Sequence, residues 1–251
     1  KNIHWFAHGK IAYVHIEFYD DTSKQWTNVV DPNGTGAASV EGDNYFSVSN
    51  WFGQNMIPDV KDLKCKLRIT DKSDSEVTVT SGEFSVYPTI TNVQVASTPP
   101  FDVSHPGEKV WAAEATGQTV TWTESSSKIT TVDIFYSTAG SGGFNFSTPI
   151  VDDWSTAQQS CNAVTVPVTR TIDAMVCVRD ANPDFASLIT KNSPGFKTVG
   201  IITQIIDPTG SSEWKIGDTT KKIKWSYNGN IQLVNIDVDY GSGYQSLDTN
   251  I

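Results

Sequence analysis

Apolar and polar side chains alternate in short windows along most of the chain. Residues 14–18 (VHIEF) and 132–136 (VDIFY) place a bulky apolar residue at every second position, and residues 64–69 (KCKLRI) put basic residues on one face and apolar residues on the other. Such alternation is typical of a strand with one buried face and does not fit helical spacing. Turn-forming clusters such as residues 31–34 (DPNG) separate the windows. We therefore predict an all-β chain of antiparallel β-sandwiches.

The alternating windows belong to a unit that occurs three times. In each copy a tryptophan is followed, at nearly constant spacing, by an alternating strand that starts with valine: Trp5 and Val14, Trp122 and Val132, Trp225 and Val234. One sandwich domain per period is the simplest reading of this self-similarity. We assign residues 1–93 to a repeat that lacks its first strand, residues 94–204 to a complete repeat and residues 205–251 to the first half of a third repeat.

The tryptophans fall into two groups by their place in the unit. The first group recurs once per copy and is expected in the sandwich cores, because a buried indole covers much apolar surface; it comprises Trp5, Trp122 and Trp225. The strand expected to pack with it in the second copy contributes Val132, Ile134 and Tyr136. The second group falls near predicted loops or edges and is expected at the surface or an interface; it comprises Trp26, Trp51 and Trp154.

The spacing of these residues resembles that of a known family. The motif of the second copy is carried by Glu108, Trp111, Gly117, Val120, Trp122, Val132, Ile134, Tyr136 and Ser137. That of the third copy is carried by Glu213, Trp214, Gly217, Ile223, Trp225, Gly229, Val234 and Ile236. Both are similar to the tandem immunoglobulin-like repeats of bacterial cell-surface proteins, including the surface-layer proteins of anammox-type bacteria. The resemblance implies immunoglobulin-like domains, a fragment of a longer array and an extracellular, cell-surface location.

Charge and cysteine content limit the partners of the chain. The formal net charge is −10, and no basic run is present, which disfavours nucleic acid. No apolar stretch has the ~18 residues of a membrane span, so no membrane insertion is expected. Alternation places Cys65 on an apolar face, as a buried and inert thiol. Cys161 and Cys177 could face each other across a hairpin, and their disulfide state is left open.

Acidic loop residues are the only candidates for a cofactor, and that cofactor is calcium, which takes six to eight oxygen ligands. The residues of this candidate site, none with EF-hand spacing, are Asp20, Asp21, Asp71, Asp74, Asp180 and Asp184, with Glu76 beside them. Two glycosylation sequons start at Asn33 and Asn145 in predicted loops. No nucleophile elbow, metal-binding histidine pair or phosphate loop occurs, so no enzymatic activity is expected of these residues.

Three functions are consistent with such a chain. The first is a structural cell-surface protein that associates with copies of itself in a self-assembling surface layer through unpaired edge strands and end loops. The second is an adhesin or carbohydrate-binding spacer that contacts cell-envelope glycans through an exposed aromatic row of Trp26, Trp51 and Phe52. The third is an accessory module of a secreted enzyme whose catalytic domain lies elsewhere. Fold analogy does not choose among them, and the surface layer is preferred because repeats alone are present.

Overall fold

The computed structural model describes residues 2–51, 53, 57–97, 107–239 and 241–249. In this part of the chain strands alternate with turns, and the helical elements are two single 3₁₀ turns, Val48–Asn50 and Gly140–Gly142. The all-β prediction is confirmed. The chain divides into two compact units, Lys1–Thr89 with Ser125–Lys128, and Ile90–Glu124 with Ile129–Ile251. They are called unit 1 and unit 2 below.

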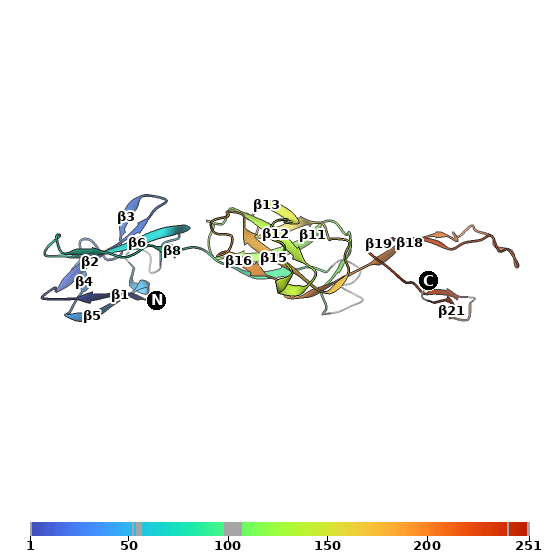
Figure 1. Cartoon of the computed structure of the whole chain (residues 1–251), viewed down its shortest axis with the longest axis horizontal. Helices are drawn as coiled ribbons and strands as arrows, with labels where there is room; N and C mark the ends of the chain where they lie inside the picture. The colour runs from blue at the N-terminus through green and yellow to red at the C-terminus, as the bar shows by residue number, and fades with distance from the viewer. Residues whose placement is uncertain (1, 52, 54–56, 98–106, 240, 250–251) are drawn as a thin grey trace. The chain divides into compact units, whose positions relative to one another are not determined.

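Unit 1 contains two antiparallel sheets. The first pairs β1 (Asn2–Ala7) with β5 (Gly42–Ser47). The second has the order β3–β2–β6–β7, with β4 on β2 and β8 on β6. Its strands are β3 (Gln25–Asn28), β2 (Tyr13–Asp20), β6 (Asp62–Asp71), β7 (Thr78–Thr80), β4 (Ala37–Ala38) and β8 (Phe84–Val86). In Figure 1, β1 and β5 lie below β2 and β6, so the two sheets form two layers.

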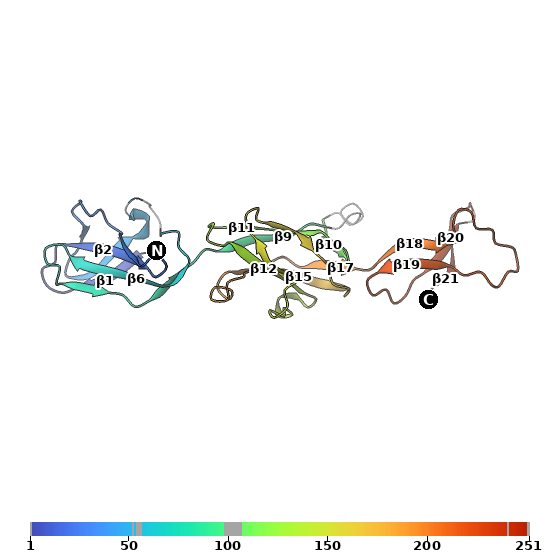
Figure 2. The ribbon, with the colours of Figure 1, turned by 90° about the horizontal axis from the view of Figure 1, so that it is seen from above.

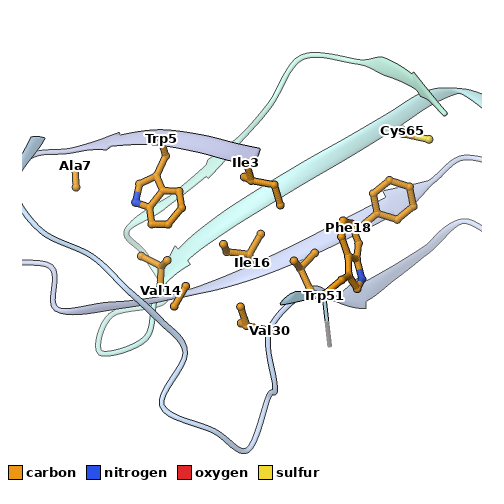
Figure 3. Packing of buried hydrophobic residues seen from close by; sticks show 11 residues of the cluster. Ile3, Trp5, Ala7, Val14, Ile16, Phe18, Val30, Trp51 and Cys65 are labelled. Atoms are coloured by element: carbon orange, nitrogen blue, oxygen red, sulfur yellow. The ribbon is translucent and has the colours of Figure 1, made fainter. Parts of the chain in front are cut away.

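The core of unit 1 lies between these layers and follows the alternation of the sequence. Ile3, Trp5 and Ala7 of β1 are buried, while their neighbours in the strand are exposed. Figure 3 shows Ile3 and Trp5 pointing from β1 toward Val14 and Ile16, which are buried residues of β2. A six-residue strand therefore contributes three apolar side chains to one face, as its period of two requires.

The part of unit 2 that ends at Val199 is also built from two sheets. One has the order β14–β11–β9, and the other the order β10–β17–β15–β12–β13, with β16 on β15. The strands of the first are β14 (Ser160–Val164), β11 (Gln118–Glu124) and β9 (Ile90–Val95). Those of the second are β10 (Val110–Ala112), β17 (Phe196–Val199), β15 (Thr171–Asp180), β12 (Thr131–Ser137), β13 (Val151–Ser155) and β16 (Thr190–Asn192). Figure 2 shows β9 and β11 on one side of unit 2 and β12 and β15 on the other.

The core residues expected in unit 2 differ in burial. Val132 and Ile134 are fully buried and Trp122 is buried, with its indole Nε1 donating to Glu124 Oε1 at 2.7 Å. Tyr136 is only half-buried, and its hydroxyl lies 2.5 Å from Oγ1 of the buried Thr198. Trp111, which belongs to the motif but not to the expected core group, is fully buried on β10.

The strands after Val199 form two further hairpin-like pairs. β18 (Ile201–Asp207) pairs antiparallel with β19 (Lys224–Asn228), and β20 (Ile236–Asp239) pairs with β21 (Tyr244–Asp248). Trp225 of β19 is half-buried rather than in a core, because the described strands here form no second layer over it. The contacts separate the chain at Thr89, a few residues before the expected limit at residue 93, and leave residues 205–251 with unit 2.

The two units share a pairing scheme. The β1–β5 pair of unit 1 has the same place in the chain order as the β11–β14 pair of unit 2, and the β2–β6 pair matches the β12–β15 pair. Strand β8 of unit 1 corresponds to β17 of unit 2, since β8 pairs with β6 as β17 pairs with β15. The described part of unit 1 has no counterpart of β9 or β10.

Candidate functional site

The outer face of the β3–β2–β6 sheet carries a cluster of charged and aromatic side chains centred on Arg68. Arg68 lies directly across the sheet from Glu17, and its Nε and Nη2 atoms contact Glu17 Oε2 at 2.8 and 2.7 Å. Its guanidinium lies 4.3 Å from the centroid of the Trp26 ring, a cation–π geometry. Because Leu67 and Ile69 turn to the other face, this cluster follows directly from the alternation of β6.

A depression of about 500 Å³ adjoins this cluster. Polar groups and apolar surface both line it, and the polar side chains include His15, Glu17, Asn28, Arg68, Thr70 and Thr78. A carboxylate, a guanidinium, an amide and two hydroxyls at one shallow site offer both donors and acceptors to a polar ligand. The half-buried Trp26 ring supplies an apolar surface beside them. This arrangement suits the binding of a polar, non-planar ligand such as a sugar, and it holds no reactive nucleophile.

A second feature is the contact between the end of β10 and the turn after β19. The Glu114 carboxylate accepts the Gly229 backbone N–H at 2.6 Å, and Arg170 Nη1 donates to the Asn230 carbonyl at 3.3 Å. Gly229 has a φ of +77°, and a Cβ at this position would lie 2.7 Å from Ala113 Cβ. Both constraints require glycine here. The residues after β10 and Arg170, just before β15, together fix where residues 229–230 contact the rest of unit 2.

The candidate calcium residues do not come together. Asp20 ends β2 and Asp21 follows it, whereas Asp71 ends β6, and the antiparallel register pairs Asp71 with Val14 at the opposite end of the sheet. Six residues of strand, or roughly 20 Å, therefore separate the two sets. Asp180 and Asp184 belong to unit 2. In the described residues no group of three or more His, Cys, Asp or Glu side chains is arranged to hold a metal ion.

These carboxylates stabilise turns instead. The Asp20 carboxylate accepts hydrogen bonds from the N–H and the hydroxyl of Ser23 at 2.7 and 2.6 Å. The Asp71 carboxylate accepts hydrogen bonds from the N–H and the hydroxyl of Ser73. The Lys24 ammonium, 2.6 Å from Asp21, holds the pKa of that carboxyl below its ordinary value. Asp74 accepts the Glu76 N–H and Asp180 the Asn182 N–H in the same way, whereas Asp184 donates its own backbone N–H to Asn182 Oδ1. Side-chain bonding to the backbone two or three residues ahead is the usual role of aspartate in a turn.

The tryptophans expected at the surface are placed differently. Trp51 is 4% exposed, and its ring contacts Phe18 edge-on at 5.5 Å, so it belongs to the core of unit 1. The interpretation of Trp51 as a surface residue is wrong, and the aromatic row that included it does not form. Phe52 lies outside the described residues. Trp26 and Trp154 are half-buried, and Trp154 Nε1 donates to the Ser160 carbonyl at 2.8 Å.

Histidines and cysteines form no reactive pair in the described part of the chain. His4 contacts Asp43 at 2.9 Å on the surface, away from His15, and His105 lies outside the described residues. Cys65, Cys161 and Cys177 are all buried free thiols. Burial raises the pKa of Cys65 to about 12, which suppresses its thiolate. Cys161 and Cys177 lie on strands of different sheets, β14 and β15, so they do not face each other across a hairpin.

The two sequon asparagines, Asn33 and Asn145, are exposed and lie in loops.

The sequence analysis missed the cluster of Arg68, Glu17 and Trp26. The available signal was a pair of opposite charges at outward positions of two alternating strands. No helix in the described residues has the length and apolar character needed to cross a bilayer. No protein-family model, curated protein or solved structure matches this chain.

Proposed function

We propose that this chain is a segment of a structural cell-surface protein whose tandem immunoglobulin-like domains assemble into an extracellular surface layer. The observation that carries the proposal is that three strand pairs of unit 1 correspond in chain order to three pairs of unit 2. The β18–β19 pair repeats the β9–β11 pair, which supports a third domain of the same kind. Repetition of one sandwich suits a protein built to extend and to associate.

Lateral contacts in such a layer would use strand edges. β7 is an edge strand of unit 1, and its Val79 side chain is 61% exposed. Unpaired backbone groups beside an exposed valine form a ready template for pairing with another chain. Contacts of this kind extend without limit when the two surfaces on each copy differ.

Self-association of the chain tests this proposal. We expect sedimentation velocity to show concentration-dependent oligomers, and negative-stain electron microscopy to show extended sheets or filaments at high concentration. The Val79→Lys variant should reduce assembly at least about tenfold, because a charged edge opposes strand pairing. The matched control is Val168→Lys, at another exposed valine outside the strands. A chain that stays monomeric at millimolar concentration, with and without calcium, would contradict a surface-layer role.

A second function, adhesion to glycans, is favoured by the Arg68 cluster and its polar depression. We expect glycan-array binding by the whole chain to fall at least about tenfold in the Trp26→Ala variant, which is about 1.4 kcal/mol, because the ring beside the depression is lost. Trp154→Ala, at a half-buried tryptophan of unit 2, is the control and should bind like the parent. Equal binding by all three chains would exclude this face as the glycan site.

A further inference from the structure

Exposed ring side chains gather on the outer face of the β1–β5 sheet of unit 1. The odd-numbered residues of β1 point into the core (Figure 3), so the even-numbered ones point outward. His4 and Phe6 are exposed in this way, and Phe6 is 58% exposed. Tyr45 of β5 lies directly opposite His4 and is 63% exposed. With His8, whose ring meets Phe6 edge-on at 4.8 Å, these residues form what we call the aromatic platform.

Contacts among its own members hold the aromatic platform in place. The His4 and Tyr45 rings are stacked, with centroids 4.5 Å apart and planes inclined by 8°. His4 Nε2 also lies 2.9 Å from Oδ1 of Asp43, the residue opposite Phe6 in the register. Parallel stacking covers one face of each ring and leaves the other to solvent. Because His4 and Tyr45 are already ordered, a ligand would lose less free energy in fixing them.

The fold does not require rings at these positions, because hydroxyl side chains occupy the matching positions of unit 2. In the β11–β14 pair Thr121 lies opposite Ser160, as His4 lies opposite Tyr45 in the β1–β5 pair. The next outward residue of β11, Thr123, is also an exposed hydroxyl residue. Core packing therefore does not account for the rings of unit 1, and contiguous exposed apolar groups are typical of an interaction site.

The exposure of the aromatic platform does not depend on which strand lies beside β1. In unit 2 the corresponding strand, β11, pairs with β9 as well as with β14, yet its outward residues Thr121 and Thr123 are exposed. Strands pair edge to edge within one sheet, so a strand added beside β1 extends the outer face and does not cover it. The platform is thus a property of the outer face of β1 and β5.

The size of the aromatic platform suits a small ligand better than a protein. Strands β1 and β5 each have six residues. Their common face therefore measures roughly 20 Å by 10 Å, or about 200 Å². A stable protein–protein interface buries about 800 Å² on each partner. A few sugar rings of a glycan match the smaller area.

The chemical groups of the aromatic platform favour a neutral sugar. The Tyr45 and Phe6 rings offer apolar surfaces to the C–H face of a pyranose, and they stand diagonally across the strand pair. In the part of the chain that the structure describes, Asp43 Oδ1 contacts His4 while Oδ2 makes no hydrogen bond and can accept hydroxyl groups. The Asp43 carboxylate would repel an anionic sugar, so an uncharged one fits best.

We propose that the aromatic platform is a binding site for a neutral glycan, whose sugar rings lie over Tyr45 and Phe6 and donate hydroxyl hydrogen bonds to Asp43. The site is separate from the Arg68 cluster, which lies on the outer face of the other sheet of unit 1. It depends neither on the surface-layer role nor on glycan binding by the Arg68 cluster, because it follows from the residues of β1 and β5 alone.

The test is isothermal titration calorimetry of the whole chain with neutral hexasaccharides of glucose, mannose, galactose and N-acetylglucosamine. We expect saturable binding of at least one of them, weakened at least about tenfold in both Tyr45→Ala and Phe6→Ala. Tyr45→Phe keeps the ring and should bind within about threefold of the parent. Tyr227→Ala, at a 51% exposed tyrosine of β19, is the matched control and should bind like the parent.

Two further measurements accompany the titration. Circular dichroism should show the same melting temperature for all of these variants, because each substituted ring is exposed. Sodium chloride at about 0.5 M should change the affinity less than about twofold, because a neutral glycan forms no ion pair that salt can screen.

Four results would overturn the proposal. The first is no saturable binding of any hexasaccharide up to about 10 mM, and the second is equal binding by the parent, Tyr45→Ala and Phe6→Ala. The third is glycan binding lost only in Trp26→Ala, which assigns the glycan to the Arg68 cluster. The fourth is binding of hexa-arginine that salt abolishes, with no sugar bound, which identifies a basic peptide as the ligand. Monomeric behaviour of the sugar-free chain counts against the surface layer and leaves the platform standing.

Discussion

Replacing Trp111 by alanine is expected to lower the free energy of unfolding of unit 2 by about 3–5 kcal/mol, the usual range for a large buried aromatic residue. Trp111 is fully buried, contacts Phe196 edge-on, and satisfies its indole N–H with the Ala96 carbonyl. The alanine variant loses the buried apolar surface, the aromatic contact and the hydrogen bond. It also leaves a cavity that the β10–β17 pair cannot close without breaking its register.

Urea unfolding followed by far-ultraviolet circular dichroism measures this loss, and hydrogen exchange assigns it to unit 2. Peptides from β11, β12 and β15 should exchange faster in the variant, and peptides from β2 and β6 should not. Trp214→Ala is the control, because that indole is 43% exposed and its removal should change stability by less than about 0.5 kcal/mol. A loss below about 1 kcal/mol for Trp111→Ala would mean that the indole does not organise the core.

Replacing Phe18 by alanine should destabilise unit 1 by about 3–5 kcal/mol. The Phe18 ring is 2% exposed and contacts the rings of Trp51 at 5.5 Å and Phe84 at 6.2 Å. Such aromatic contacts contribute beyond the area that they bury. The loss should appear in the exchange of β2 and β6, with unit 2 unchanged.

The control for this variant is Phe6→Ala, at a ring on β1 that is 58% exposed and should cost less than about 0.5 kcal/mol. Faster exchange of unit 2 in Phe18→Ala would contradict the division of the chain at Thr89. Together the two core variants test whether each unit depends on its own layer of side chains.

Local alternation was sufficient to predict the buried faces of the first strands of the chain. In β1 and β2 the expected inward residues Trp5, Val14 and Ile16 are the buried ones. This success has a simple cause, because side-chain direction in a strand depends only on the parity of the position. The all-β class of the fold could therefore be predicted without information from distant residues.

Trp51 shows where this reasoning fails. It lies just after the 3₁₀ turn Val48–Asn50, in no strand, so no periodicity fixes its direction. Its burial comes from Phe18, which is far away in the sequence and reaches it only after both sheets have formed. The same limit applies to the acidic residues, since the ends of β2 and β6 at which Asp20 and Asp71 lie depend on strand register.

The Arg68 cluster was predictable in part. Alternation places Glu17 and Arg68 on outward faces, but their contact needs the pairing of β2 with β6, and the stacking of Trp26 needs the β2–β3 register. Neither register follows from one sequence, because many pairings of short strands satisfy the same pattern. The chemical groups could thus be identified from the sequence, whereas the site could not.

The parallel β10–β17 pair gives unit 2 a mechanical property. The chain enters the two larger sheets of unit 2 through β9 and β10 and leaves them through β17 toward β18, and residues 110–112 of β10 lie opposite residues 197–199 of β17. Tension along the polypeptide pulls these two parallel strands in opposite directions, so the bonds between them are loaded in shear and must yield together. A domain tied in this way resists stretching more than one whose terminal strands unzip bond by bond.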